Sequence, residues 1–106
     1  MSGEEQFKKI LEDNKVVIFS KSWCPFCRQA ISILENADIP HRLVDLEEEA
    51  DGDAIHSAVK DTVGKTSVPQ VFIDGQSLGG CDDLKAAKSS GDLAGLLDTC
   101  GVTHKL

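Results

Sequence analysis

One short apolar run, VVIFS at residues 16–20, limits the possible folds more than any other stretch of the chain. It is rich in β-branched and aromatic residues and shows no alternation with polar side chains. Such a run is typical of a strand whose two faces are both covered. We therefore expect it to be the central strand of a sheet that carries helices on both sides.

The spacing of apolar residues predicts helices before and after this strand. Helical spacing occurs before residue 14, at residues 27–36, at residues 55–63, and from residue 82 onward with a pause at residues 89–91. The apolar residues after the pause share one helix face with Cys100, which we expect to be a small core residue. They are Leu93, Leu96 and Leu97.

Two further apolar runs, residues 41–46 and residues 70–74, predict additional strands. Asp74 and Gly75 then predict a hairpin turn into a short fourth strand, which the glycines at 79 and 80 end. Because strand, helix and strand follow one another from residue 16, the first two strands should be parallel. The predicted fold class is α/β, a four-stranded mixed sheet with helices on both faces.

The chain has 106 residues, which fits one compact domain over residues 1–106. Its formal net charge of −7 argues against nucleic acid or an anionic membrane as a partner. No apolar run reaches the roughly 20 residues that cross a bilayer, and the first residues lack the features of a signal peptide. We expect a soluble, monomeric, cytoplasmic protein, or an organellar one if a targeting segment has been removed.

Two of the four cysteines, Cys24 and Cys27, are separated by two residues in the sequence CPFC. Such a pair can be a metal site, a structural disulfide or a reactive dithiol. Four cysteines are too sparse for a secreted domain stapled by disulfides. A zinc site needs a second close pair of ligands, but Cys81 and Cys100 are far apart and the three histidines have no paired spacing. We therefore favour the dithiol and expect no metal.

Pro25 suits the first position of a helix, which makes Cys24 the predicted N-cap. An ordinary thiol, with a pKa near 8.5, is only about 3% thiolate at pH 7. Lowering that pKa by about two units takes about 2.7 kcal/mol, whereas a helix dipole typically supplies about 0.3–1 kcal/mol. The backbone N–H groups of Phe26 and Cys27 and the cation Lys21 are expected to supply the rest.

Cys27 begins the apolar stripe of the same helix, so it should be buried and have a more ordinary pKa. Cys24, just past the end of the central strand, should be exposed. An exposed attacking thiol beside a sheltered resolving thiol is the arrangement that thiol–disulfide exchange requires.

Three motifs in register resemble the glutaredoxins, members of the thioredoxin-fold superfamily. CPFC is similar to their dithiol motif Cys-Pro-Tyr-Cys, with Phe26 in place of tyrosine. TSVPQVFIDG resembles their Thr-Val-Pro segment and the strand after it, and LGGCDDL matches their Gly-Gly-Cys-Asp-Asp signature. The resemblance implies a thioredoxin fold and glutathione as reductant.

The resemblance also implies roles for residues around the cysteines. Phe26 would form an aromatic wall beside the sulfur, and Lys21 would meet the glycine carboxylate of glutathione. In glutaredoxins the proline equivalent to Pro69 is cis, and the residue before it, here Val68, pairs through its backbone with the glutathione cysteine. Ser67 takes the place of the threonine in that segment.

The γ-glutamyl end of glutathione would be held where the Gly-Gly-Cys-Asp-Asp motif opens a helix. There the backbone N–H groups at Gly80 and Cys81 would meet the carboxylate, and Asp82 or Asp83 the ammonium group.

The glycine end departs from the family pattern. His56 stands where the family often has a glutamine, and Thr66 where it has an arginine. Lys65 could substitute for that arginine, or it could be an ordinary surface charge.

The function implied is that of a glutathione-dependent thiol–disulfide oxidoreductase. Cys24 would be the nucleophile and Cys27 the resolving cysteine, acting on glutathionylated proteins and protein disulfides. Two rival functions stay open. In one, two chains share an iron–sulfur centre through Cys24 and two glutathione molecules. In the other, the protein is a thioredoxin-like reductase served by a flavoenzyme.

Overall fold

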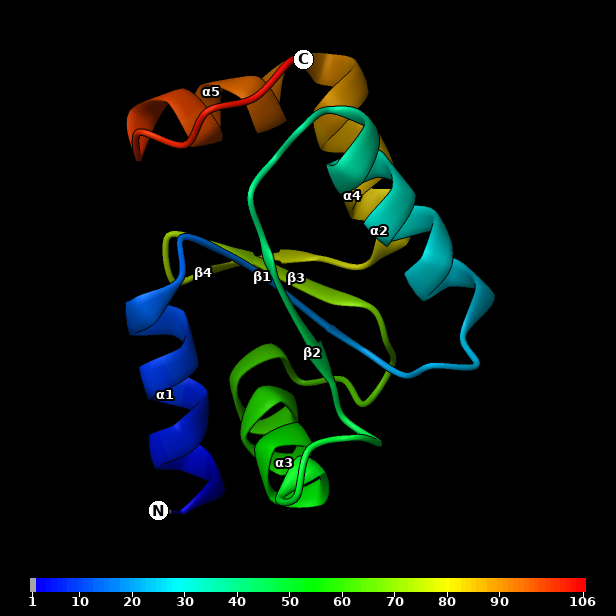
Figure 1. The fold of residues 1–106 in the computed structure, drawn as a ribbon, viewed down its shortest axis with the longest axis vertical. Helices are drawn as coiled ribbons and strands as arrows, with labels where there is room; N and C mark the ends of the chain where they lie inside the picture. The colour runs from blue at the N-terminus through cyan, green and yellow to red at the C-terminus, as the bar shows by residue number, and fades with distance from the viewer. Residues whose placement is uncertain (1) are drawn as a thin grey trace.

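The computed structural model describes residues 2–106. Nine helices and strands follow one another in this part of the chain (Figure 1). They are α1 (Gly3–Asp13), β1 (Val16–Ser20), α2 (Pro25–Asn36), β2 (Arg42–Asp45), α3 (Gly52–Val63), β3 (Gln70–Ile73), β4 (Gln76–Gly79), α4 (Cys81–Ser90) and α5 (Asp92–Thr99). This order confirms the predicted alternation and the α/β class.

The four strands form one mixed sheet in the order β2-β1-β3-β4. β1 pairs with β2 in parallel and with β3 antiparallel, and β3 pairs with β4 antiparallel. The apolar run at residues 16–20 is therefore an inner strand, and all of its residues are buried. Its carboxyl end, and that of the parallel strand β2, lie at the edge from which the Cys24 loop leaves the sheet.

Successive residues of β1 point to opposite faces of the sheet and divide the core into two layers. Val16 and Ile18 pack with α2, α4 and α5, while Val17 and Phe19 pack with α1 and α3. Figure 1 shows these two groups of helices on opposite sides of the sheet. The absence of polar alternation in β1 is explained by this double cover.

Three phenylalanines join the layer on the side of α1 and α3. The ring of Phe7 lies 5.6 Å from that of Phe19 and 5.5 Å from that of Phe72, and Phe19 and Phe72 are 5.6 Å apart between centroids. Edge and tilted contacts at these distances add about 0.5–1.5 kcal/mol per pair to the gain from burial. They fix α1 to the two inner strands.

The hairpin between β3 and β4 has the predicted turn at Asp74 and Gly75. Both residues have positive φ, 50° and 78°, as the common two-residue hairpin turn requires. The Asp74 N–H also donates to the Lys15 carbonyl at 2.7 Å, and the Lys15 ammonium contacts the Asp74 carboxylate at 3.0 Å. The turn is thereby attached to the segment before β1.

Several predicted details differ from the structure. β2 is shorter than residues 41–46, and β3 ends at Ile73. The predicted pause after α4 is a complete break, because Gly91, with φ 89°, ends α4 and precedes α5. Leu96 is 42% exposed, so it does not share the buried face of Leu93 and Leu97.

Cys100 was expected in the core but is only half-buried, because α5 ends at Thr99 and leaves it at the edge of the helix layer. It still packs against the cluster that holds Leu93 and Leu97. None of the helices between residues 2 and 106 is long and apolar enough to cross a membrane.

Candidate active site

The pair Cys24 and Cys27 lies at the start of α2. Cys24 is the N-cap residue, with an extended backbone, and Pro25 occupies the first turn, as predicted. The backbone N–H of Cys27 donates to Cys24 Sγ at 3.4 Å. The sulfur thus takes the position in which a serine or aspartate oxygen commonly caps a helix.

Cys24 is less accessible than predicted. Its residue is only 5% exposed, because the thiol turns inward and contacts the Val68 carbonyl at 3.6 Å, donating to it. The aromatic residues on either side of it project instead: Trp23 is 66% exposed and Phe26 is 57% exposed. The sulfur is therefore covered on the Val68 side, while two exposed aromatic rings stand next to it in the sequence.

Cys27 is buried as predicted, and its residue is 1% exposed. Its pKa, however, is not ordinary. Burial raises the pKa of the Cys27 thiol to about 12, and the hydrogen bond with Cys24 acts in the same direction. A backbone hydrogen bond with Lys21 lowers it in part. Both cysteines are free thiols, so the structure holds the reduced pair.

A groove with a volume of about 220 Å³ opens beside Phe26. Most of the residues predicted to bind glutathione line it: Phe26, Ser67, Val68, Pro69, Gly80, Cys81, Asp82 and Asp83. The peptide bond between Val68 and Pro69 is cis, as the family resemblance implied. The groove joins three segments that are far apart in the sequence, the start of α2, the segment before β3 and the start of α4.

The start of α4 forms one side of this groove. Gly79 has φ 117°, a conformation that favours glycine, and Gly80 is the N-cap. The Asp83 carboxylate accepts a hydrogen bond from the Gly80 N–H at 3.0 Å. The Asp82 side chain has no hydrogen bond or ion pair with other residues of the described range 2–106. Asp83 therefore has a structural partner, whereas Asp82 is free for a ligand.

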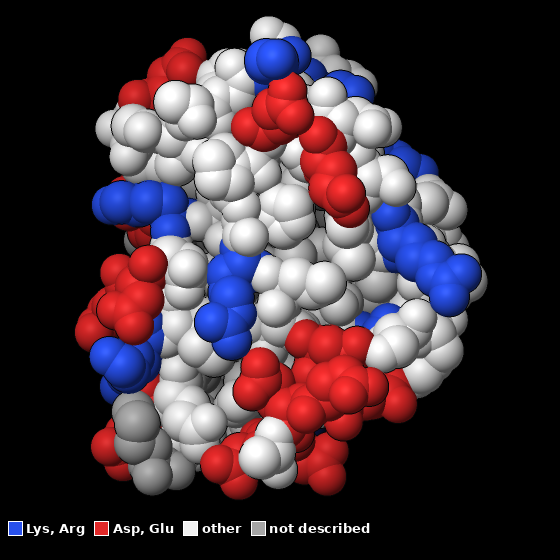
Figure 2. Space-filling model, in the orientation of Figure 1, with Lys and Arg blue, Asp and Glu red and all other residues white. Residues whose placement is uncertain are grey.

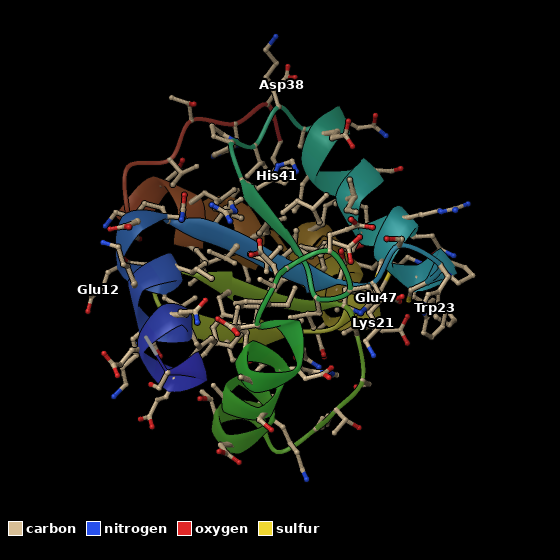
Figure 3. All side chains as sticks on the ribbon, turned by 60° about the horizontal axis from the view of Figure 1, so that its bottom comes forward. Glu12, Lys21, Trp23, Asp38, His41 and Glu47 are labelled. Carbon is tan, nitrogen blue, oxygen red and sulfur yellow. The ribbon has the colours of Figure 1, made fainter. Side chains whose placement is uncertain are left out.

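Lys21 and His56 do not line the groove. Lys21 lies in a separate hollow with acidic residues of the loop after β2, and Figure 3 shows it beside Glu47. His56 instead donates through Nε2 to the Thr66 carbonyl at 2.8 Å. It thus holds the segment that leads to Val68 and affects the groove only through the position of that segment.

Lys65, Gln70 and Gly79 also line the groove, and the predicted site omitted all three. Gln70 is 3% exposed, and its amide group donates to the Ser67 carbonyl at 2.9 Å, which braces the turn around Pro69. A polar residue at the start of an otherwise apolar strand was the available signal for Gln70. Lys65 was considered as a substitute cation, and it is the cation among the lining residues.

The surface around the site is strongly acidic on one side. Figure 2 shows a continuous area of Asp and Glu side chains in the lower part of the view, over α3 and the loop before it. Glu47, Glu49, Asp51 and Asp53 line the hollow that holds Lys21. The glutathione groove and this acidic area are formed by different segments of the chain.

Within residues 2–106, no three His, Cys, Asp or Glu side chains are grouped so that they could hold a metal ion. The site geometry therefore consists of the two thiols, the groove and the charged residues beside them.

The chain is similar in sequence to known proteins. The Glutaredoxin family model matches residues 16–78. The chain is 47% identical to Glutaredoxin-C4 of Arabidopsis thaliana over 101 residues, which cover 94% of this chain and 75% of that protein. It is 37% identical to Glutaredoxin-1 of Rhizophagus irregularis over 94 residues, 89% of this chain and 93% of the relative.

Solved structures give the same result for the fold. The crystal structure of a buckwheat glutaredoxin–glutathione complex superposes with a TM-score of 0.89 at 31% identity, covering 93% of this chain and 90% of that one. Oxidized glutaredoxin 2 from Chlamydomonas reinhardtii superposes with a TM-score of 0.80 at 40% identity, covering 95% and 98%. The fold is therefore the thioredoxin fold of these structures, and the chain belongs to the glutaredoxin family.

Proposed function

We propose that this protein reduces protein–glutathione mixed disulfides, and also protein disulfides, with glutathione as the reductant. Membership of the glutaredoxin family already implies a thiol redox function that depends on glutathione. The proposal adds the substrate class and the division of work between the two cysteines. Cys24 is the nucleophile, and Cys27 is the resolving thiol.

One observation carries this assignment. Cys24 Sγ accepts the Cys27 N–H at the N-terminus of α2, while Cys27 is fully covered and holds its proton tightly. An N–H donor and the positive end of a helix both stabilise a sulfur anion. The two thiols thus differ in their readiness to attack, and only Cys24 borders the groove segment at Val68.

The first step is attack of the Cys24 thiolate on the glutathione sulfur of a mixed disulfide. A sulfur–sulfur bond forms between Cys24 and glutathione, the bond between glutathione and the protein breaks, and the protein leaves as a thiolate that takes up a proton. A second glutathione thiolate then attacks the sulfur of the glutathione on Cys24, which releases oxidised glutathione and regenerates the Cys24 thiolate. In the other branch, Cys27 displaces glutathione and closes the internal disulfide.

The groove has groups that complement the ends of glutathione. The N-terminus of α4 offers backbone N–H groups to a carboxylate, Asp82 can accept from the ammonium group, and the Val68 backbone can pair with the cysteine unit. Lys65 lines the groove, and we assign it to the second carboxylate. The buckwheat structure is, by its own description, a glutathione complex, which supports glutathione as the ligand.

The test is a glutathione-coupled assay on a glutathionylated peptide, run on the wild type, Cys24→Ser and Cys27→Ser. We expect Cys24→Ser to lose all turnover and Cys27→Ser to keep it, because the second glutathione can complete the cycle. Retained turnover in Cys24→Ser would refute the role of Cys24. Reduction of the oxidised pair by a flavoenzyme reductase but not by glutathione would instead favour the thioredoxin-like function.

A further inference from the structure

Asp45 is tied to the loop that carries the nucleophile. It is the last residue of β2, directly opposite Ser20 in the parallel register with β1. Its Oδ2 atom accepts a hydrogen bond from the hydroxyl of Ser22, two residues before Cys24. Its Oδ1 atom accepts the Glu47 N–H at 2.9 Å. Both carboxylate oxygens are therefore held, one by the cysteine loop and one by the turn after β2.

The loop between β1 and α2 has few other anchors. The Cys24 N–H donates to the Lys21 carbonyl at 3.1 Å and so closes a tight turn. Within residues 2–106, the bond from Ser22 to Asp45 is the hydrogen bond by which a side chain of residues 21–23 reaches another strand, and the Lys21 backbone also contacts the Cys27 thiol. Loss of the bond to Asp45 would detach the turn before Cys24 from β2 and leave it held only by contacts with the start of α2.

Asp45 also acts on Cys27 through its charge. The hydrogen bond from Ser22 holds the pKa of Asp45 below its ordinary value, so the group is a carboxylate at neutral pH. That negative charge contributes to the raised pKa of Cys27, behind the contributions of burial and of Cys24. An anion beside a thiol opposes the formation of a second anion there.

The other charged groups around α2 do not replace Asp45. Cys24, on the helix cap, is the other titratable group that acts on Cys27. From α4, which packs against α2, Lys85 contacts the Gln29 side chain at 2.7 Å. The Lys21 side chain lies in the hollow with Glu47 and the acids that follow it. Among the described residues 2–106, none forms an ion pair with the Asp45 carboxylate, so its charge acts on Cys27 without being neutralised.

We propose that Asp45, through its hydrogen bond with Ser22 and its charge, is a positioning residue that restrains Cys27 from closing on glutathionylated Cys24. This inference rests on the proposed function, because it concerns the fate of the Cys24–glutathione intermediate. Restraint of closure leaves the intermediate for a second glutathione. Asp45 thereby sets how often a second glutathione, and not Cys27, releases the glutathione bound to Cys24.

The step that Asp45 restrains is an exchange without net oxidation. The Cys27 thiolate attacks Cys24 Sγ, a bond between the two cysteine sulfurs forms, and the bond from Cys24 to glutathione breaks. Glutathione leaves as a thiolate and takes up the proton that Cys27 lost. The rate of the step therefore follows the thiolate fraction of Cys27 and the geometry of the loop.

The test measures glutathione release from the preformed Cys24–glutathione intermediate as a function of pH, in the absence of free glutathione. Asp45→Asn keeps an oxygen that can accept from Ser22 but removes the charge. We expect its pH profile to move down by about half a pH unit, which makes closure roughly threefold faster at pH 7. Ser22→Ala keeps the charge but releases the loop from Asp45, so its profile should keep the midpoint while closure becomes roughly threefold faster at every pH.

Glu48→Gln is the matched control, because it removes an exposed charge from the same acidic loop. Its profile should coincide with that of the wild type. A profile of Asp45→Asn that also coincides with the wild type would overturn the proposal. The proposal would also be overturned if Glu48→Gln shifted the pH profile as far as Asp45→Asn does. The shift would then result from the change in net charge.

Alkylation of Cys27 in the Cys24→Ser background tests Asp45 without glutathione. The pH at which Cys27 becomes reactive should fall by about half a unit when Asp45→Asn is added. If the wild type fails to form the Cys24–glutathione intermediate, the proposed function fails, and the alkylation profile alone decides for or against Asp45.

Discussion

Cys24 Sγ lies 3.6 Å from the carbonyl oxygen of Val68, a residue 44 positions later in the chain. This contact joins the candidate nucleophile to the wall of the groove in which glutathione is proposed to bind. The position of that wall is set by residues that do not touch glutathione in the proposal. Chief among them is His56, which donates to the Thr66 carbonyl from α3.

Replacement of His56 by leucine should weaken glutathione binding with little change in the chemical step. The hydrogen bond to Thr66 is lost, so the segment that carries Val68 becomes less ordered, and the groove must be ordered on binding. We expect the KM for a glutathionylated peptide to rise roughly threefold, the effect of about 0.7 kcal/mol. His56→Gln retains a donor and should restore the wild-type KM, and failure of that rescue would contradict the role given to the hydrogen bond.

Asp82 and Asp83 should separate into a binding residue and a structural residue. The sequence allowed either carboxylate to meet the glutathione ammonium group, but Asp83 is already bonded to the Gly80 N–H. Asp83→Ala should lower the free energy of unfolding by about 0.5–2 kcal/mol, as expected when an N-terminal cap is removed. Asp82→Ala should leave stability within about 0.5 kcal/mol of the wild type.

In glutathione affinity the order should be reversed: Asp82→Ala should lose affinity and Asp83→Ala should largely keep it. Loss of a charge-assisted hydrogen bond of about 1.5 kcal/mol corresponds to roughly tenfold weaker glutathione binding in Asp82→Ala. Urea unfolding and calorimetric titration with oxidised glutathione measure the two quantities. A tenfold loss of affinity in Asp83→Ala, with none in Asp82→Ala, would exchange the two assignments.

The fold could be predicted well because its main signals are local. The buried run at residues 16–20, the Asp74 and Gly75 turn and the proline after Cys24 each constrain the backbone within a few residues. Strand ends were less accurate, since the residues at the ends of β2 and β3 pair with few neighbours. The exposure of Leu96 depends on where α5 packs, which helical spacing alone does not determine.

The sequence was sufficient to identify the motif residues of the candidate site, but it did not predict their burial or their pKa values. The burial of Cys24 follows from its contact with Val68, and the raised pKa of Cys27 follows from its cover by the rest of the fold. Both depend on segments that are distant in the sequence. The family resemblance assigned Lys21 to the glycine carboxylate of glutathione, but its side chain lies in the acidic hollow instead.

The raised pKa of Cys27 predicts a loss of stability in alkaline solution. An unfolded cysteine releases its proton near its ordinary pKa of 9.0, whereas folded Cys27 holds it up to about pH 12. The contribution to stability is therefore complete below pH 9.0 and is lost as the pH rises toward 12. Urea unfolding of the reduced protein across this range should show a steeper decline for the wild type than for Cys27→Ala. Equal dependence of the unfolding free energy on pH in the two proteins would contradict the raised pKa of Cys27.

Gly79 and Gly75 offer a matched pair of glycine substitutions. Both have positive φ, 117° and 78°, so alanine strains the backbone at either position, by roughly 1–2 kcal/mol. A Cβ atom at Gly75 would meet nothing within 4 Å, whereas one at Gly79 would collide with the Asp83 carboxyl group, whose carbon lies 2.7 Å away. Only Gly79→Ala must therefore displace the side chain that caps Gly80.

Gly79→Ala should consequently lose both stability and glutathione affinity, while Gly75→Ala should lose stability alone. The displaced Asp83 no longer fixes the Gly80 N–H, and the first turn of α4, which forms one side of the groove, loses its order. We expect affinity for oxidised glutathione to fall roughly fivefold in Gly79→Ala, or about 1 kcal/mol. If the two variants lose affinity equally, the collision with Asp83 is irrelevant and backbone strain at the hairpin explains both.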